Sequence, residues 1–345
     1  MNFVKPLLAW YEQNHRDLPW RNTRDPYHIW VSEIMLQQTR VAAVIPYYER
    51  FLKELPAVTD LARCDEDRLL KLWQGLGYYS RARNLKKAAE TVVQTHGGEL
   101  PRTYAQLKKL SGIGSYTAAA VASIAYGERV PAVDGNVLRV YTRLYDLACD
   151  VTEEKTKKQV FDALLQQMPK QAGTFNQAMM ELGATVCVPN GAPHCDHCPI
   201  AAQCLARRNG TVALRPVKKP KPERCEELLT VFVLTQGDRF LLRKRKCAGL
   251  LADLYELPNV SGHLVQSRGG RPDLARALDG IRALGATPCG EITVYERRHI
   301  FTHRTWQMQV VACAVAESEI EGWLWYDGTQ SLPTAFGICI QNERS

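Results

Sequence analysis

Four cysteines in the second half of the chain restrict its fold more than any other feature. Cys187, Cys195, Cys198 and Cys204 lie within 18 residues, separated by intervals of seven, two and five residues. Thiolates this close together usually bind a metal, and the spacing by itself is compatible with a structural zinc ion or an iron–sulfur cluster. Because the intervals do not match those of ferredoxins, zinc is the default on spacing alone. We therefore expect residues 187–204 to form a metal-binding loop.

The other cysteines bear on the cellular compartment. The chain has 345 residues and 11 cysteines, and an odd number without an export signal favours a reducing cytoplasm over a disulfide framework. No segment approaches the roughly 20 apolar residues of a membrane span, so we expect no membrane association. The formal net charge of +8 is compatible with a polyanionic partner but does not require one. The length favours two domains.

Residues 1–214 are predicted to form a mostly helical region. Asp25 and Pro26 have the residue types of a helix cap and of a first helical position, so a helix should begin there and end near residues 37–39. Further helices are predicted near residues 41–55, 65–73, 78–97, 116–126, 153–167 and 174–185.

The pattern changes at residue 215. Residues 215–222 are rich in proline and lysine, which favours an extended linker, and we assign residues 215–225 to it. Beyond the linker, apolar residues alternate as in strands. Strands are predicted near residues 228–235 and 239–245, joined by a hairpin turn, and again near residues 293–299, 307–315 and 323–326. Residues 226–345 should therefore form an α+β domain.

The stretch from Leu110 to Val137 combines a tight turn, a helix and an acid. Gly112 and Gly114 flank one isoleucine, and an alanine-rich helix follows that should end at Gly127. Glycines permit backbone conformations that a side chain would block, so the turn could direct N–H groups at a phosphate of a nucleic acid. The alternative is an ordinary turn between helices, because a lone Gly-x-Gly is weak evidence.

Two acids from separate segments are candidates for catalysis. Glu33 lies among apolar residues, which should raise its pKa and suit it to donate a proton, unless it is exposed on a polar helix face. Asp134 follows the alanine-rich helix and could instead be a helix cap. If both carboxyls face one cavity, they could flank a glycosidic bond, with one protonating the leaving group and one opposing positive charge on the sugar.

Amide and aromatic side chains at helix ends could contact a base stack. Gln37, Gln38 and Tyr78 could act as wedges that hold open the gap left by a flipped nucleotide, or could be ordinary surface and packing residues. The basic residues that follow Tyr78 are most simply a solvated face and would become phosphate contacts if the wedge hypothesis holds: Arg81, Arg83, Lys86 and Lys87.

Together these motifs resemble a known family. The run LSGIGSYTA at residues 110–118 resembles the helix–hairpin–helix of DNA glycosylases of the endonuclease III superfamily, and VDGNV at 133–137 resembles the segment with its catalytic aspartate. Within that superfamily, four further motifs are similar to the MutY-type adenine DNA glycosylases: LPWR at 18–21, SEIMLQQT at 32–39, WQGLGYYSRARNL at 73–85 and ELPN at 256–259. The resemblance covers nearly the whole chain.

The resemblance implies roles for the central residues. Glu33 would protonate the adenine ring and later direct water, Asp134 would stabilise an oxocarbenium-like sugar, and Asn136 would support Asp134. Tyr116 occupies the position at which bifunctional relatives have a lysine. Because a phenol cannot form a Schiff base, strand-cleaving lyase activity should be weak or absent.

The same resemblance implies binding residues. Trp20 and Arg21 would line the adenine pocket. Gln38 and Tyr78 would be the wedge, with further DNA contacts from Gln37, Gly112 and Gly114. The four cysteines would hold one 4Fe–4S cluster, with zinc as the alternative. The second domain would be Nudix-like and would recognise 8-oxoguanine through the loop Phe301, Thr302 and His303.

The chain departs from the family pattern in three places. The first cysteine interval has seven residues instead of the usual six, Thr302 replaces a serine, and residues 261–280 contain no Arg-Glu-x-x-Glu-Glu run of a Nudix metal site. The extra residue should bulge within the Pro189–His194 loop. The threonine retains a hydroxyl, and the missing acids argue against nucleotide hydrolysis by the second domain.

The expected protein is therefore a cytoplasmic, monomeric, monofunctional glycosylase. It would act on double-stranded DNA that contains adenine opposite 8-oxoguanine or guanine. Two alternatives remain open. The chain could be an endonuclease III-like glycosylase and lyase for oxidised pyrimidines, or it could be a non-catalytic DNA-binding protein with a structural metal.

Overall fold

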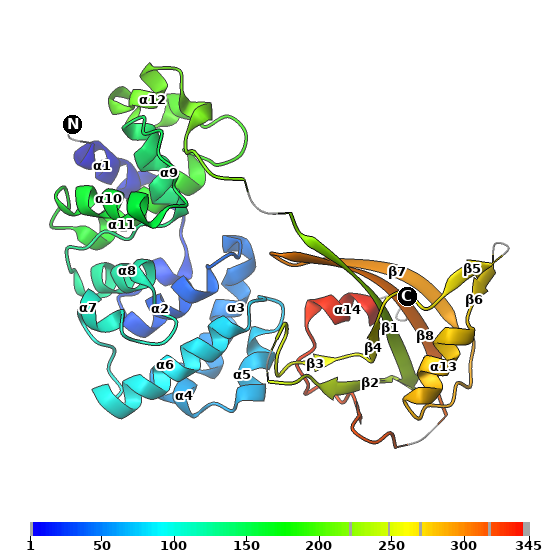
Figure 1. The fold of residues 1–345 in the computed structure, drawn as a ribbon. Coiled ribbons are helices and arrows are strands. Elements are labelled where there is room, and N and C mark those ends of the chain that lie inside the picture. Colours follow the sequence, from blue (N-terminus) through cyan, green and yellow to red (C-terminus); the bar gives the residue numbers. More distant parts are fainter. Residues whose placement is uncertain (1–2, 221–222, 248, 269–270, 317–318, 341–345) are drawn as a thin grey trace. The chain divides into compact units, whose positions relative to one another are not determined.

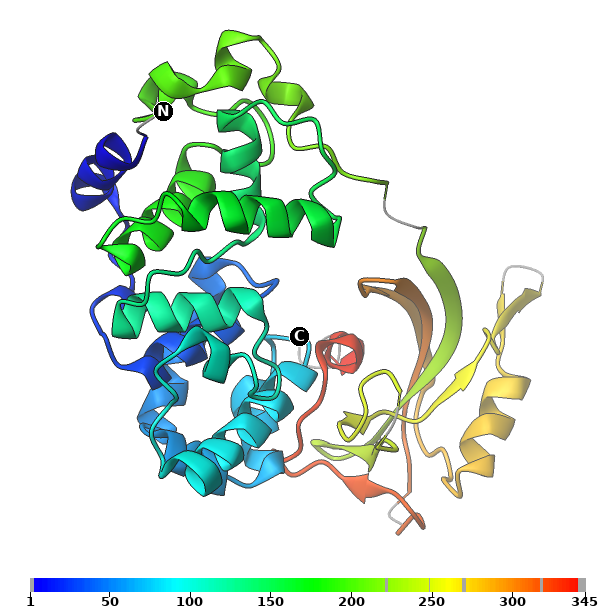
Figure 2. The same cartoon turned by 60° about the vertical axis from the view of Figure 1, so that its left-hand side comes forward.

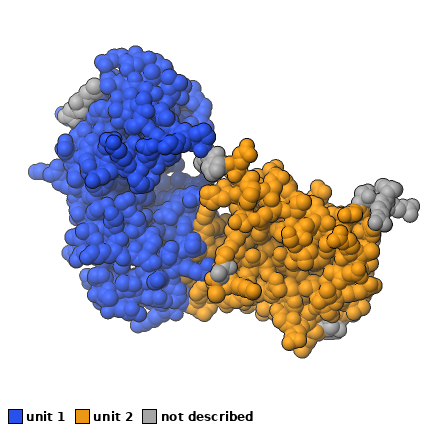
Figure 3. All heavy atoms as spheres, viewed as in Figure 1, with its two compact units in different colours: residues 1–64, 80–220 blue, residues 65–79, 221–345 orange. Residues whose placement is uncertain are grey.

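The chain forms two compact units. The computed structural model describes residues 3–220, 223–247, 249–268, 271–316 and 319–340. The first unit consists of Met1–Cys64 and Ser80–Pro220, and the second of Asp65–Tyr79 and Lys221–Ser345 (Figure 3). The division expected from the sequence is contiguous, whereas residues 65–79 group with the second unit. None of the described helices is long and apolar enough to cross a membrane.

The first unit is helical, as predicted. Helices at the positions predicted from the sequence appear with similar bounds, whereas the sequence gives no predicted bounds for α1, α4, α7, α9 and α12. The elements are α1 (Val4–Asn14), η1 (Pro19–Arg21), α2 (Pro26–Met35), α3 (Val41–Glu54), α4 (Val58–Arg63), α6 (Ser80–His96), α7 (Tyr104–Leu107), α8 (Ser115–Tyr126), α9 (Gly135–Leu144), α10 (Glu154–Leu165), α11 (Ala172–Thr185), η2 (Cys195–His197), η3 (Ala201–Gln203), α12 (Leu205–Arg208) and η4 (Val212–Leu214).

Helix α2 begins where the sequence predicts. The Asp25 side chain accepts hydrogen bonds from the backbone N–H groups of Tyr27 (2.8 Å) and His28 (3.3 Å), and Pro26 occupies the first helical position. These bonds satisfy donors that have no partner inside the helix. The helix ends at Met35, and the turn that follows contains Gln37 and Gln38.

Helix α8 connects the two halves of the helical unit. Four of its five alanines are fully buried, and it packs against both α2 and α11, while α11 also contacts α1 and α9 (Figures 1 and 2). Small side chains allow helices to approach closely, so α8 brings residues of α2 and α11 to one place. Gly127 ends α8 in the left-handed conformation, with φ of +74°.

The two glycines before α8 differ in their backbone requirements. Gly112 has φ of +72°, and a Cβ atom there would lie 2.6 Å from Cβ of Asn84. Gly114 has φ of −82°, and a Cβ atom would meet nothing within 4 Å. The conformational freedom of glycine is therefore used at Gly112, whereas Gly114 has an ordinary extended backbone.

The start of the predicted linker is bound to the helical unit. The Arg143 guanidinium donates to the carbonyl oxygen of Arg215 (3.0 Å), Arg215 pairs with Asp146 (3.0 Å), and the backbone N–H of Val151 donates to Val217 (3.1 Å). The backbone is extended, as proline and lysine favour, but its first residues are held by specific partners. Residues 221–222 of the linker lie outside the described part of the chain.

The second unit is built around a mixed sheet. Seven strands of the described chain form it, with the main order β3-β2-β1-β8-β7; β1 and β8 are parallel and the other neighbours antiparallel. The elements are α5 (Glu66–Trp73), β1 (Cys225–Gln236), β2 (Arg239–Lys244), β3 (Tyr255–Glu256), β4 (Asn259–Ser261), β5 (Gln266–Arg268), β6 (Arg271–Asp273), α13 (Ala275–Ala283), β7 (Thr293–Ile300), β8 (Arg304–Ala314), β9 (Leu324–Trp325) and α14 (Thr334–Ile340).

Successive side chains of β1 point to opposite faces of the sheet, and each face packs against a different helix. Val231 and Val233 pack with α14, whereas Phe232 and Leu234 pack with α13 on the other face. The predicted hairpin between β1 and β2 is confirmed, with a turn at Gly237 and Asp238. The strands that were not predicted, β3 to β6, are two or three residues long and too short for a clear alternating pattern.

The motif at residues 256–259 holds the sheet edge together. Glu256 is only 5% exposed, and its carboxylate accepts hydrogen bonds from Arg243 (2.8 Å), from Arg245 and from Asn259 (3.0 Å). Buried carboxylates need such partners. The motif therefore has a structural role in this unit.

The contrast between the two glycines can be tested by stability measurements. We expect Gly112→Ala to lower the free energy of unfolding by about 1–3 kcal/mol, because it combines a left-handed backbone with a close contact. Gly114→Ala is the matched control and should change stability by less than about 1 kcal/mol. Denaturant unfolding of both variants measures the difference. Equal losses would contradict the assignment of backbone strain to position 112.

Candidate active site

One cavity in the helical unit collects most of the predicted catalytic and pocket residues. Its volume is about 510 Å³, which lies in the usual range for small-molecule sites. Glu33 from α2, Tyr116 from α8 and Asp134 from the start of α9 all line it. The other predicted residues that line it are Trp20, Arg21, Gln37, Gln38 and Asn136.

Glu33 is a buried acid with a neutral partner. Its residue is 6% exposed, and the Tyr116 hydroxyl donates to Glu33 Oε2 at 2.6 Å. Burial raises the pKa of Glu33 to about 7; the Tyr116 hydrogen bond opposes this and the nearby Asp134 carboxylate adds to it. A substantial fraction of Glu33 is therefore protonated near neutral pH, and the alternative of an exposed surface glutamate is excluded.

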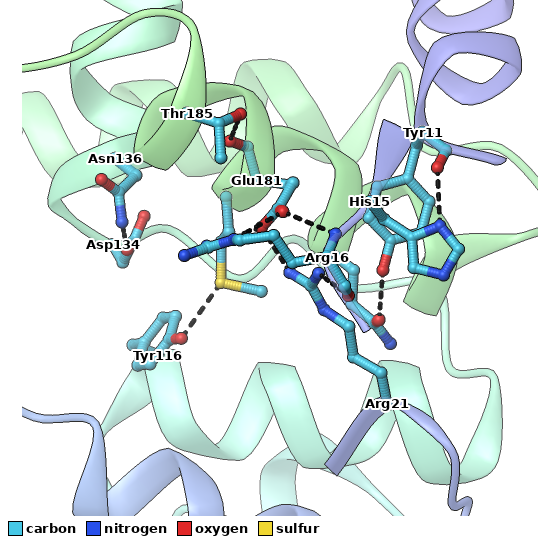
Figure 4. Close-up of polar contacts among 11 residues, drawn as sticks. Tyr11, His15, Arg16, Arg21, Tyr116, Asp134, Asn136, Glu181 and Thr185 are labelled. Carbon is cyan, nitrogen blue, oxygen red and sulfur yellow. Dashed lines mark hydrogen bonds and ion pairs between the residues drawn. The ribbon is translucent and has the colours of Figure 1, made fainter. Parts of the chain in front are cut away.

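Tyr116 remains a neutral phenol. Burial raises the pKa of its hydroxyl well above the usual value, and the carboxylates of Glu33 and Asp134 raise it further. The hydroxyl also lies 3.1 Å from Sδ of Met180, on α11 (Figure 4). Tyr116 can thus orient Glu33 without itself releasing a proton.

Asp134 is a helix cap whose carboxylate also lies in the wall of the cavity. It caps α9, with Oδ1 accepting from the backbone N–H of Val137 (2.8 Å), and its carboxylate lines the cavity. Oδ2 accepts from the Asn136 amide (2.7 Å; Figure 4). Burial raises the pKa of Asp134, whereas these hydrogen bonds and the charge of Arg139 oppose the rise. The N-terminus of α9 also favours the anion.

Arg139 connects Asn136 to the cysteine loop and was not found from the sequence. Its guanidinium donates to Asn136 Oδ1 (2.8 Å), to the Gly183 carbonyl (2.8 Å) and to the Cys187 carbonyl (2.7 Å). It follows Asp134 by five residues on α9, and an arginine on the inner face of an amphipathic helix is the signal that could have indicated it.

A second buried glutamate forms the charged wall of the cavity. Glu181 is 1% exposed and accepts hydrogen bonds from the Arg16 guanidinium (2.8 Å to each oxygen), the Arg16 backbone N–H (3.0 Å) and Arg21 (2.5 Å; Figure 4). Burial alone would raise the pKa of Glu181, but the two arginines outweigh it and lower the pKa to about 2. No local sequence pattern identifies Arg16 and Glu181 as partners, because their segments lie far apart in the chain.

The predicted pocket residues Trp20 and Arg21 sit in the short helix η1. Trp20 is 7% exposed and packs edge-on against Tyr48, with ring centroids 5.4 Å apart. Arg21 also donates to the Arg16 carbonyl oxygen (2.8 Å). Both side chains are therefore held in place in the wall of the cavity.

The turn after α2 places both glutamines at the cavity. Gln37 donates to the Thr117 hydroxyl (3.3 Å), and Gln38 is exposed with φ of +58°. Arg81, which was expected on a solvated basic face, is only 9% exposed. That expectation was wrong, because Arg81 lies on the inner face of α6 and donates to backbone carbonyls of this turn.

The second unit contains the predicted wedge residue Tyr78 and the predicted lesion-contacting loop at residues 301–303. The hydroxyls of Tyr78 and Thr302 are hydrogen-bonded at 2.5 Å, and Tyr78 is 44% exposed with φ of +48°. Phe301 packs between His299 and Trp306, while His303 is exposed in the turn between β7 and β8. The predicted wedge residue Tyr78 and the predicted lesion loop thus share one site.

The four cysteines line one cavity in the helical unit. Arg143 also lines it and donates to Sγ of Cys187 (3.2 Å). The long first interval is closed by a hydrogen bond from His194 N–H to the Val186 carbonyl (3.0 Å), with Gly191 in the left-handed conformation. Among the described residues, no group of three or more His, Cys, Asp or Glu side chains is arranged to hold a single metal ion.

Comparisons with known proteins agree with this geometry. Residues 31–167 match the HhH-GPD superfamily of base excision DNA repair proteins, and residues 230–341 match the NUDIX domain. The adenine DNA glycosylase of Mus musculus is 36% identical over an alignment that covers 92% of this chain and 71% of that protein. The chain belongs to the adenine DNA glycosylase family.

This glycosylase also resembles solved structures of DNA glycosylases in its helical part. A thermostable thymine-DNA glycosylase is 29% identical with a TM-score of 0.55, and the match covers 60% of this chain and 95% of that one. An endonuclease III in a non-covalent DNA complex is 25% identical with a TM-score of 0.52, covering 60% and 94%. The predicted family, fold class and enzyme class are confirmed: this is an enzyme that hydrolyses N-glycosidic bonds in DNA.

The raised pKa of Glu33 makes stability depend on pH. The folded state holds the proton up to about pH 7, whereas an unfolded glutamate releases it near its ordinary pKa of 4.5. Ionisation therefore destabilises the folded protein as pH rises between these values. We expect Glu33→Gln, which cannot ionise, to gain about 2 kcal/mol relative to the parent between pH 5.5 and 8.5.

Denaturant unfolding at several pH values measures this gain. Asp134 titrates in both proteins, so the difference between the two curves isolates residue 33. A difference that stays constant across the range would contradict the assignment of a raised pKa to Glu33.

Proposed function

We propose that this glycosylase removes undamaged adenine opposite 8-oxoguanine, or opposite guanine, by base flipping and acid catalysis without cutting the strand. The observation that carries the proposal is that Glu33 and Asp134 face the same cavity, with Tyr116 hydrogen-bonded to Glu33 at 2.6 Å. The glycosidic bond of a stacked adenine is out of reach, so the base must enter the cavity from a flipped nucleotide.

Glu33 is suited to begin the reaction. In its protonated form it gives a proton to a ring nitrogen of adenine, and the base departs as a neutral molecule instead of an anion. The Glu33 carboxylate that remains can then accept a proton from the water that attacks the sugar carbon. This second step restores the acid and leaves an abasic site.

Asp134 is suited to oppose the positive charge that develops on the sugar. Its hydrogen bonds from Val137 and Asn136 orient the anion before the reaction, which is the arrangement that stabilises a developing charge most effectively. None of the described residues that line the cavity is a lysine. No amine is therefore at hand to form a Schiff base, which supports hydrolysis over lyase chemistry.

The charged wall is formed before any base enters the cavity. Glu181 is ionised, and its acceptor sites are occupied by the Arg16 guanidinium, the Arg16 backbone N–H and Arg21. The buried carboxylate therefore holds Arg16 and Arg21 in fixed positions beside the proposed adenine pocket.

The second unit supports recognition of the opposite base. 8-Oxoguanine differs from guanine by an N–H donor and a carbonyl acceptor on one edge, and the Thr302 hydroxyl can pair with either. Tyr78 would act as a wedge against the base stack, and Gln38 is the corresponding wedge candidate within the helical unit. Gln37 and the turn at Gly112 and Gly114 would contact the DNA backbone.

The cysteine loop supports one 4Fe–4S cluster. Cys187, Cys195, Cys198 and Cys204 all line one cavity, so four sulfur ligands of the kind that hold such a cluster lie together. Arg143 donates a hydrogen bond to the sulfur of Cys187 at the edge of this cavity. When bound, the cluster would hold this loop in shape, and it takes no part in the steps above.

Single-turnover base excision tests the function. On duplexes that differ only in the base opposite adenine, we expect the highest rate with 8-oxoguanine, then guanine, and strand breaks only after alkali treatment. Glu33→Gln and Asp134→Asn should lower the rate by about 10²-fold or more while DNA binding is retained. Release of oxidised pyrimidines, or strand cleavage without alkali, would contradict the proposal.

Metal analysis tests the cluster. The purified protein should be brown and contain about four iron atoms per chain, and the colour should fade when the cysteines are alkylated after unfolding. A colourless protein with one zinc ion per chain would rule the cluster out without bearing on the adenine reaction.

A further inference from the structure

Arg81 lies on α6 and has no role in the proposed reaction. It is 9% exposed, and its Nη1 atom donates to the carbonyl oxygens of Ile34 (2.7 Å), Met35 (3.1 Å) and Gln37 (2.5 Å). Nη2 lies 3.4 Å from the Thr39 hydroxyl. A single guanidinium thus binds the end of α2 and the turn beyond it.

These carbonyl oxygens have a physical need for such a partner. The last carbonyl oxygens of a helix accept no hydrogen bond from within the helix, and the C-terminus carries partial negative charge. Water would normally satisfy them, but α6 packs against α2 here. A buried cation that donates to three of them satisfies the helix end and joins α6 to it.

The turn held by Arg81 has an uncommon conformation. Gln38 has φ of +58°, a region that residues other than glycine rarely adopt unless the surroundings enforce it. Its neighbour Gln37 donates to Thr117 on α8. Gln38 itself is exposed, lines the cavity, and has no hydrogen bond of its side chain within the described chain. The backbone of the turn therefore sets the direction in which the Gln38 side chain leaves the main chain.

We propose that Arg81 is a positioning residue that fixes the turn at residues 36–39 and thereby directs Gln38 into the gap left by the flipped nucleotide. The inference rests on the proposed function, because it assumes base flipping. Arginine suits the role better than lysine, since its planar group is pre-organised to donate in several fixed directions. Arg81 acts through the turn and does not contact the reacting atoms.

Base excision on two DNA duplexes distinguishes an effect on the wedge from an effect on catalysis. One duplex has normal base pairs around the adenine:8-oxoguanine pair, and in the other the neighbouring pairs are mismatched, so that the adenine is already unstacked. We expect Arg81→Met to lower the single-turnover rate about 10- to 100-fold on the paired duplex, because extrusion then lacks its wedge. On the mismatched duplex the loss should be less than about threefold.

Matched variants make the comparison specific. Gln38→Ala should give the same pattern, and the double variant should lose no more than either single one, since both remove one function. Lys158→Met removes an exposed cation of α10 and should behave as the parent does on both duplexes. The proposal would be overturned if the rate losses of the two single variants added up in the double variant. It would also be overturned if Arg81→Met lowered the rate equally on both duplexes.

Amide hydrogen exchange in the free protein supplies a readout that needs no activity. We expect Arg81→Met, and to a smaller extent Arg81→Lys, to speed exchange at residues 37–39 while α8 and α9 stay protected. The lysine variant keeps the charge and serves if the methionine variant does not fold. Unchanged exchange in the turn would overturn the role of Arg81, whereas an inactive parent protein would overturn only the proposed function.

Discussion

The hydrogen bond between Tyr116 and Glu33 is the interaction on which the candidate site depends. Glu33 sits on an apolar helix face where an ionised carboxylate would lack solvation, and the phenol supplies the one polar contact that burial demands. Helix α8 packs against α2, and this contact brings Tyr116 to Glu33. Burial between packed helices is thus what raises the pKa of this acid to about 7.

The same cavity holds two glutamates in opposite states. Burial raises the pKa of Glu33 to about 7, whereas Arg16 and Arg21 lower that of Glu181 to about 2. Both carboxyls are shielded from water, so the difference comes from the partner: a neutral phenol in one case and two guanidinium groups in the other. A proton donor and a fixed ion pair can therefore lie in the wall of one cavity.

Buried arginines account for part of the positive charge of the chain. Arg81, Arg139 and Arg143 are each less than 10% exposed and donate to backbone carbonyls, to an amide or to a sulfur. They join helix ends and loops around the cavity. Because some of these cations are buried, the net charge of +8 overstates the positive charge available to a DNA-binding surface.

The sequence by itself determined the helical and mixed α/β division, the start of α2, the end of α8 and the residues Glu33, Tyr116 and Asp134. Short motifs carry these features, because a cap, a left-handed glycine or an acid in an apolar run acts on its own neighbours. Only the tertiary structure decided which acids share a cavity. It also decided that Glu181 lines this cavity and that Arg139 and Arg81 bind residues of its wall. Their partners lie tens of residues or more away along the chain, or on an inner helix face that local pattern does not identify. Whether a charged side chain is solvated or buried depends on what packs over it, and packing is a property of the fold.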